Sequence, residues 1–393
     1  MKFCYHGLYA HYFITLLGIM TPPYTLLHLS LIPNIGPGTF KKLAEYVVNE
    51  GIDLYALTTA DYMNLGIGEA VAQKLVEGLQ DRIAFDKEVK LLESTGIAWT
   101  TFGQPDYPAM LWHTHFPPLV LYWQGTAVWD TGQALSVVGS REGTEYGRRA
   151  VETLVAPCVE KGFIIVSGGA RGIDTMAHEC ALAYGGQTVA VLGSGLLKPY
   201  PASNKRLFLK IAQEGGAVVS GFPLLTEAIG WNFPERNRII AGMTRGCLVV
   251  QGARKSGALI TAKFALNEGR NVYAVPGPFD DPLSEGCHVL LQDGAQLVLT
   301  ADDILQDYGL SVSPQEKASV QVQTELPLQK EIVFTKKTKK VYEGLEALCE
   351  RPISVQELVD QTGKDENELK MELFDLQLAG KLQQDFAGLW SRS

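Results

Sequence analysis

The sequence has few features of a metal centre, a disulfide-stabilised fold or a membrane protein. Its six cysteines lie at Cys4, Cys158, Cys180, Cys247, Cys287 and Cys349, and no two of them have metal-ligand or redox spacing. Because their neighbours are mostly apolar, we expect reduced thiols in the core of a cytoplasmic protein. The apolar run over residues 12–20 is too short to cross a bilayer and has no signal-peptide charge pattern, so we expect no membrane association.

The sequence also lacks a basic excess. Its 393 residues carry 34 Lys and Arg against 43 Asp and Glu, for a formal net charge of −9. Residues 1–132 hold 7 basic and 12 acidic side chains, residues 133–305 hold 16 of each, and residues 306–393 hold 11 and 15. This balance argues mildly against nucleic acid as a partner. An anion site in the neutral middle therefore has to arise from local placement of charge.

The length predicts two or three domains, and the first is helical. Residues 1–20 are expected to be an extension. Residues 21–98 place two glycine turns, Gly36–Gly38 and Gly66–Gly68, between apolar-periodic segments, as in a helix-hairpin-helix or SAM-like domain. Such a turn can offer backbone N–H groups to a DNA phosphate. The acidic balance of this region favours a packing role instead.

Residues 99–310 are predicted to form a connecting strand and a Rossmann-like core. Short runs rich in Val and Ile alternate with helical segments, the pattern of parallel strands buried on both faces. After the connecting strand "PLVLYW", the runs are "ALSVVGS", "GFIIVSGG", "QTVAVLGSG", "AVVSGFP", "CLVVQGA", "NVYAVPG" and "AQLVLT". We therefore expect an α/β fold with a doubly wound, mostly parallel sheet.

Residues 311–335 are expected to be a polar linker, and residues 336–393 a winged-helix domain. The pattern predicts helices over 338–349, 354–361 and 365–378, and then a hairpin in "KLQQDFAGLWSRS". The third helix is acidic, which is unfavourable for reading a DNA major groove, so a protein-contact or autoregulatory role is the favoured interpretation. The basic run "KKTKK" could still touch a phosphate.

Glycine, serine and arginine gather at the carboxyl ends of the expected strands, where an open parallel sheet binds its ligands. The loops include "GSREGTEYG", "SGGARGIDTMAH", "GSGLLKPYP", "NFPERNRIIAG" and "QGARKSGALITA". Glycine lets the backbone approach an anion, helix N-termini offer N–H donors, and arginine adds a permanent charge. Together the loops predict an extended anion groove.

A dinucleotide or nucleoside triphosphate site does not fit this edge. The first turn lacks G-x-G-x-x-G, the second strand ends in Ser167-Gly168-Gly169 without an acid for a ribose, and no Walker lysine is present. Arg141 suits one phosphate of a polyanion better than a buried pyrophosphate. We expect no cofactor.

Catalytic and metal sites are also unsupported. His113 and His115 have no third ligand nearby in the sequence, so a surface or packing role is favoured. Asp174 and His178 share a helix face at i, i+4 and could serve acid–base chemistry. Capping and packing at the start of that helix is the favoured alternative, and we do not expect an enzyme.

Six ordered motifs give the chain a family resemblance. "VVGSR", "SGGARGIDTMAH", "VAVLGSGL…YP", "NFPERNRIIAG", "SGALITAKFALNEGRNVYAVPG" and "DPLSEGCHVLLQDGA" resemble the DNA-processing protein A family, also called Smf or DprA, over about residues 21–393. The resemblance implies a bacterial, non-enzymatic protein of natural transformation that dimerises and protects incoming single-stranded DNA. It also implies help in loading RecA onto DNA covered by single-strand-binding protein.

The resemblance gives Arg141 as a main phosphate contact. The other residues expected in the groove are Ser140, Gly168, Gly169, Arg171, Lys205, Asn237, Arg238, Ser256 and Gly257. We expect Arg238 to contact DNA and leave Arg236 open, because one of the two could pair with a carboxylate such as Glu235 or Asp174.

The chain departs from the family pattern at three places. Gly169 replaces a common leucine, and Ala202 stands where some members have lysine, a role that Lys198 or Lys205 could take. Gly230 and Trp231 stand where some members have a basic residue. Trp231 could stack a base or act as a hydrophobic plug.

Two further expectations follow. The segment "CHVLLQDGAQLVLTADDIL" offers an apolar helix and strand for a symmetric dimer. The alternative function is a nucleotide-processing hydrolase of the phosphoribohydrolase (lonely-guy) type, which has a similar glycine-rich edge. Its "PGGxGTxxE" glutamate has no counterpart in "SGGARGID".

Overall fold

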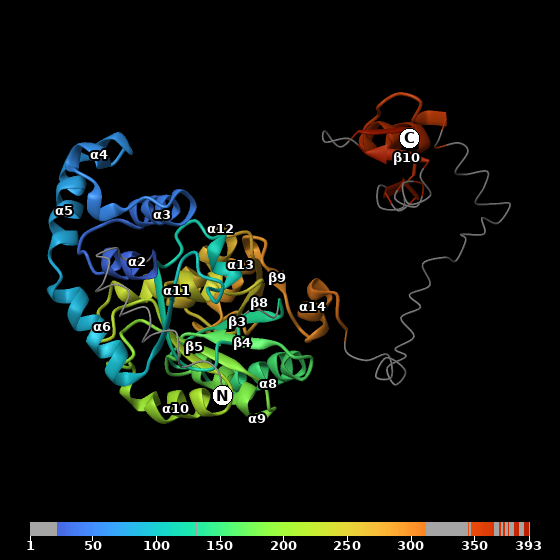
Figure 1. Ribbon diagram of the computed structural model, residues 1–393. Coiled ribbons are helices and arrows are strands. Elements are labelled where there is room, and N and C mark those ends of the chain that lie inside the picture. Colours follow the sequence, from blue (N-terminus) through green and yellow to red (C-terminus); the bar gives the residue numbers. More distant parts are fainter. Residues whose placement is uncertain are drawn as a thin grey trace. The chain divides into compact units, whose positions relative to one another are not determined.

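The computed structural model describes residues 22–129 and 132–311, together with 345, 347–364, 369–370, 372–373, 376, 381–384 and 389–392. The chain divides into two compact units, residues 1–314 and 315–393. The first unit holds both the helical region and the α/β core (Figure 1). The expected extension and nearly all of the expected linker lie outside the described residues.

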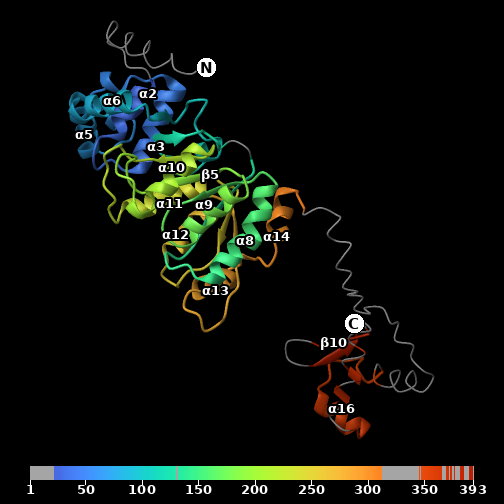
Figure 2. The ribbon, with the colours of Figure 1, turned by 90° about the horizontal axis from the view of Figure 1, so that it is seen from below.

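Short helices form the N-terminal part of the first unit. They are α2 (Pro22–Ser30), α3 (Pro37–Glu45), a π-helical turn (Tyr46–Glu50), a 3₁₀ turn (Leu54–Ala56), α4 (Thr59–Asn64), α5 (Glu69–Gln80) and α6 (Ile83–Thr95). The two expected glycine turns precede α3 and α5, whose N-caps are Gly36 and Gly68. Thr58 and Asp61 form a capping box that starts α4. In Figure 2, α2, α3, α5 and α6 gather at one end of the first unit.

A nine-stranded sheet forms the core, in the order β1-β2-β6-β5-β4-β3-β7-β8-β9. The strands are β1 (Ala98–Thr101), β2 (Val120–Gly125), β3 (Ala134–Val138), β4 (Ile164–Ser167), β5 (Thr188–Leu192), β6 (Ala217–Ser220), β7 (Gly246–Val249), β8 (Asn271–Ala274) and β9 (Gln296–Leu297). All neighbours from β6 to β9 are parallel. The sequence predicted β2 to β9, and the mostly parallel α/β sheet with a helical N-terminal region is confirmed.

The other end of the sheet differs from the expectation. β2 pairs antiparallel with β6, and β1, which the sequence did not predict, pairs antiparallel with β2. The pair covers the edge of β6, which would otherwise present unpaired backbone groups. It also brings the chain directly from α6 into the sheet, so the helical region and the core share one hydrophobic cluster.

Helices cover both faces of the sheet, as alternation along β3 requires. Leu135 and Val137 pack in a cluster with α8 (Glu145–Glu160), α9 (Ile173–Ala183) and α14 (Asp302–Leu305). Val138 belongs to the other cluster, with α11 (Asn232–Gly242), α12 (Gly257–Asn267) and α13 (Glu285–Gln292). Figure 1 shows α10 (Lys205–Gln213) on the side of α8 and α9.

The described cysteines fit the predicted core role. Cys158, Cys180, Cys247, Cys287 and Cys349 are buried and unpaired. Burial raises the pKa of Cys158 and of Cys247 to about 12, so both are neutral thiols at physiological pH. Within the described ranges, no helix is both long and apolar enough to cross a membrane.

The second unit is described only in part. Its helix α16 (Val355–Thr362) starts at a capping box of Ser354 and Glu357. Strands β10 (Leu382–Gln384) and β11 (Trp390–Arg392) pair antiparallel where the hairpin was expected. A small core includes Leu345, Cys349, Ile353, Leu358, Leu369, Leu373, Leu376, Leu382 and Trp390. Most of the predicted third helix, 365–378, lies outside the described residues.

Candidate anion-binding groove

The groove lies where the strand order reverses. From β3 the chain continues to β4 on one side, while β7 lies on the other, so the loops after β3 and β7 diverge at the carboxyl edge. A cavity of about 490 Å³ opens there. It is lined by Val138–Glu142, by the first turns of α11 and α12, and by Asp174, Ala253 and Leu283 among others.

Backbone hydrogen bonds to two neighbouring segments hold the loop that carries Arg141. The Ser140 N–H donates to the Gln251 carbonyl at 2.7 Å, and the Ser140 carbonyl accepts from the Ile173 N–H at 3.0 Å. Gly172, just before α9, has φ +76°, a conformation that L side chains rarely adopt. The turn after β3 is therefore held between the loop after β7 and the start of α9, with Arg141 exposed at its tip.

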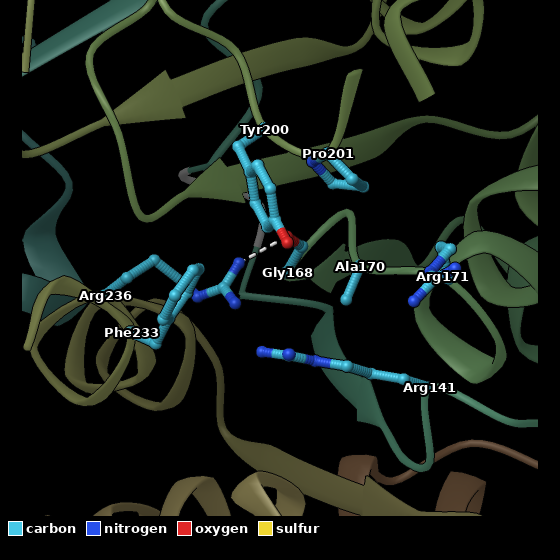
Figure 3. Close-up of a pocket in the computed structure, with 8 residues that line it drawn as sticks. All are labelled: Arg141, Gly168, Ala170, Arg171, Tyr200, Pro201, Phe233 and Arg236. Atoms are coloured by element: carbon cyan, nitrogen blue, oxygen red, sulfur yellow. Dashed lines mark hydrogen bonds between the residues drawn. The ribbon is translucent and has the colours of Figure 1, made fainter. Parts of the chain in front are cut away.

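A second pocket adjoins the cavity, and three arginines face it (Figure 3). Its lining residues are Arg141, Gly168, Ala170, Arg171, Tyr200, Pro201, Phe233 and Arg236. The Arg141 guanidinium lies 5.3 Å from the centre of the Phe233 ring. Tyr200 and Phe233 form an aromatic pair with centroids 5.8 Å apart.

Two of these arginines carry uncompensated charge. Among the described residues, neither Arg141 nor Arg171 has a carboxylate within 4 Å. By contrast, Arg148 pairs with Glu145, and Lys198 pairs with Glu227 at 2.8 Å. Exposed, unpaired arginines at one opening form a site for an anion, and their planar groups suit phosphate.

Arg236 has a different task. It is buried and donates to the Gly168 carbonyl, shown in Figure 3, and to the Val191 carbonyl at 2.6 Å. Its Nε donates to Asn237 Oδ1 at 3.1 Å. Burial lowers the pKa of Arg236 to about 10, opposed by the charge of Asp174, so it stays protonated at neutral pH. Arg236 therefore ties α11 to the ends of β4 and β5.

Asp174 supports the same loops. Its carboxylate accepts from the Ala170 N–H at 3.3 Å, and it lies near Arg236. Burial raises the pKa of Asp174, while the nearby Arg236 acts in the opposite direction. A Cβ on Gly168 would lie 2.7 Å from Asp174 Oδ2 and closer still to Arg236, so only glycine fits there.

The structure brings together seven of the ten predicted groove residues. Ser140, Arg141, Gly168, Arg171, Asn237, Ser256 and Gly257 line the cavity or the adjoining pocket. Gly169 faces Phe208 instead, where a Cβ would lie 2.6 Å from the ring. Lys205 is exposed at the start of α10, outside both linings.

Arg238 lines a different pocket. Its guanidinium lies between the rings of Phe116 and Phe264, 5.4 and 5.1 Å from their centroids, and 3.5 Å from Glu235. The pocket there lies between the helical region and the core. Of the two arginines of α11, Arg236 lines the pocket of the groove, whereas Arg238 pairs with Glu235.

Sequence reasoning missed three aromatic and proline residues of the groove. Tyr200, Pro201 and Phe233 line the pocket beside Arg141. The segments "KPYP" and "NFPERN" could have indicated these residues, because each follows an expected strand and places an aromatic residue next to a proline.

The acid–base candidates are held in structural roles. His178 is fully buried, and its Nδ1 lies 2.7 Å from Thr188 Oγ1. Burial, with a smaller effect of Arg236, lowers its pKa to about 3. Among the described residues no group of three His, Cys, Asp or Glu could hold a metal. His115 pairs with Glu268 at 3.0 Å.

The sheet and its edge define a Rossmann-like protein with a basic groove at the switch point. The chain belongs to the DNA recombination-mediator protein A family, the DprA/Smf family, because the model of that family matches residues 98–309. Protein Smf of Escherichia coli is 43% identical over 210 residues, 53% of this chain and 56% of that protein. Protein Smf of Synechocystis is 36% identical over 287 residues, 71% of each chain.

A solved structure agrees with this assignment. The DNA processing protein A (DprA) of Streptococcus pneumoniae superposes with a TM-score of 0.62 at 34% identity, over 74% of this chain and 98% of that one. The match to the Escherichia coli protein, by contrast, spans little more than half of that protein's length.

Proposed function

We propose that this protein binds single-stranded DNA in the groove formed by the cavity and the adjoining pocket. The observation that carries the proposal is the pair of exposed, unpaired arginines, Arg141 and Arg171, facing one opening beside the buried Arg236. Phosphates are the anions that such a row of guanidinium groups and glycine-rich turns accepts. Aromatic residues beside them suit unpaired bases.

The residues have distinct proposed roles. Arg141 and Arg171 bind phosphates, and Ser140, Gly168, Asn237, Ser256 and Gly257 let the backbone and small polar groups approach the strand. Gly169 shapes the turn. Lys205 and Arg238 are proposed as secondary contacts for a strand that continues beyond the groove.

The test is a charge reversal at Arg141. Arg141→Glu should weaken binding to a labelled oligothymidylate by at least tenfold, because a charge-assisted contact of about 1.5–3 kcal/mol is lost and repulsion is added. Lys161→Glu is the matched control, an exposed cation at the C-cap of α8. Fluorescence anisotropy measures both. Wild-type affinity of a folded Arg141→Glu variant would falsify the assignment.

The cellular role proposed follows from family membership. We propose a cytoplasmic, homodimeric mediator of natural transformation that protects incoming single strands and helps load RecA onto DNA covered by single-strand-binding protein. The family's description as a recombination mediator and the DNA-processing name of the Streptococcus pneumoniae relative support it. A RecA strand-exchange assay on covered DNA, with and without this protein, tests the loading step.

We also propose that the protein is not an enzyme. Asp174 and His178, its acid–base candidates, are engaged in holding loops and packing. Release of free base from nucleoside monophosphates would instead support the phosphoribohydrolase alternative.

For the second unit we propose a winged-helix domain over residues 336–393, after a linker over 311–335. The capped helix α16, the antiparallel pair of β10 and β11 and the leucine-rich core support it. Its proposed role is protein contact or autoregulation. Within the first unit we likewise propose a helical SAM-like part over residues 21–98 and a connecting strand with a Rossmann-like core over residues 99–310.

A further inference from the structure

Two large aromatic side chains stand almost fully in solvent. Trp231 is 85% exposed and Phe279 is 90% exposed. Trp231 occupies the N-cap position of α11 without making a capping hydrogen bond, and Phe279 lies in the loop after β8. Neither side chain contributes to the core. Trp231 is therefore not a hydrophobic plug.

Trp231 and Phe279 lie in the first and the last of a row of loops that follow the parallel strands. The strands run in the order β6-β5-β4-β3-β7-β8, all parallel, so their following loops leave from the same edge. Trp231 is in the loop after β6, and Phe279 is in the loop after β8. The loops between them carry Arg171, Arg141 and Ser256. Five strand spacings of about 4.8 Å separate β6 from β8, or roughly 24 Å.

Each outer loop is bonded to the groove. On one side, the Gly195 N–H donates to the Thr226 carbonyl at 2.9 Å and the Leu197 N–H donates to the Leu224 carbonyl at 3.0 Å. These bonds hold the Trp231 loop beside the segment that ends in Tyr200. On the other side, the Gly252 N–H donates to the Leu283 carbonyl at 2.6 Å, and Leu283 lines the cavity.

We propose that Trp231 and Phe279 are base-stacking platforms at the two ends of the groove, so that one strand is held by its phosphates in the middle and by a nucleobase at each end. The inference rests on the proposed function. Strands β6 and β8, which precede the two loops, lie roughly 24 Å apart. A single strand that covered this distance at a stacked spacing of ~3.4 Å would hold about seven nucleotides. Every base has a π face, so the platforms accept any sequence, whereas a duplex keeps its bases stacked on one another.

The experiment separates bases from phosphates. Two labelled probes are compared by anisotropy, an oligothymidylate of about eight residues and a backbone of equal length built from abasic residues. Trp231→Ala should weaken thymidylate binding about five-fold to a hundred-fold and leave abasic binding within about twofold. Trp231→Phe should keep most of the thymidylate affinity. Phe279→Ala should act in the same direction as Trp231→Ala.

Two controls complete the design. Tyr184→Ala removes another exposed aromatic, at the C-cap of α9 and therefore at the opposite edge of the sheet, and should change neither affinity. Thymidylate should quench tryptophan fluorescence in the wild type, and less so in Trp231→Phe.

The outcomes are distinct. If the wild type binds both probes and Trp231→Ala affects neither, or affects both equally, the stacking platform is wrong and the proposed function stands. If the wild type binds neither probe, the proposed function itself fails.

Discussion

At the scale of single residues, Arg236 shapes the groove while remaining buried. Replacing it with Met should lower the free energy of unfolding by about 3–5 kcal/mol, because Asp174 is left as an unpaired buried charge and two carbonyls lose their donor. Urea denaturation measures the loss. The double variant with Asp174→Asn should recover part of it. Equal stabilities of the single and double variants would show that an unpaired charge on Asp174 is not the source of the loss.

His178 should make the fold sensitive to acid. Its pKa is about 3 in the folded chain and about 6.5 in an unfolded one, so below pH 6.5 only the unfolded chain takes up the proton. Stability is therefore complete above pH 6.5 and falls as the pH drops toward 3. Between pH 7 and pH 5 the loss from this group is about 2 kcal/mol.

The measurement compares the change in unfolding free energy from pH 7 to pH 5 in the wild type and in His178→Gln. The variant should lose about 2 kcal/mol less over that interval. His113→Gln, at an exposed histidine for which no ion pair is found among the described residues, is the control and should follow the wild type. The same pH dependence in both variants would exclude His178 as the source.

The sequence predicted some of these residues better than others. Arg141 could be placed because a strand, a glycine and a polar turn are all local signals. Arg236 could not, because two arginines two positions apart lie on different faces of one helix and the sequence does not say which face meets the sheet. Tyr200 and Phe233 needed the pairing of loops about 30 residues apart.

At the scale of elements, one helix supports the loop after β6, which leads to Trp231 and Phe233. Glu88 of α6 is buried and accepts from the Leu224 N–H at 2.8 Å, and the Leu224 carbonyl accepts from Leu197. Glu88→Ala leaves that N–H unsatisfied, so we expect a loss of about 1–3 kcal/mol in stability and weaker binding of single-stranded DNA.

Glu88→Gln keeps an acceptor oxygen and should retain most of both properties. Urea denaturation and oligothymidylate binding are measured side by side. A stable Glu88→Ala variant with normal binding would show that the loop keeps its place without this bond.

The strands themselves show what local pattern can and cannot predict. The parallel strands β3 to β8 are short, mostly apolar runs in which nearly every residue is buried, and each was recognisable alone. β1 is four residues, "AWTT", with two polar threonines, and its partner follows after 18 residues of turns and prolines. β1 forms because it pairs with β2, so no pattern within its own four residues predicts it.

At the scale of the whole molecule, binding should reside in the first unit. Removing residues 311–393 should change the affinity for an oligothymidylate by less than about threefold, because Arg141 and Arg171 of the groove both precede the cut. Three to five phosphate contacts predict a log–log salt slope of roughly −2 to −3.5, at about −0.7 per phosphate. Salt titrations of the full-length and shortened proteins give both numbers.

A tenfold loss on shortening, or a much flatter slope, would make the second unit a principal DNA-binding element. An unchanged slope together with an unchanged affinity would leave that unit for contacts with other proteins.

The antiparallel pair β1 and β2 has a consequence for how such a gene can be rearranged. Leu26, Leu29 and Leu92 of the helical region share a hydrophobic cluster with Val120 and Val219 of the sheet. A gene cut at residue 98 would therefore encode a sheet whose apolar residues had lost their leucine contacts from the helical region. Fusion or shuffling should succeed beyond residue 311, whereas the helical region and the sheet have to be inherited together.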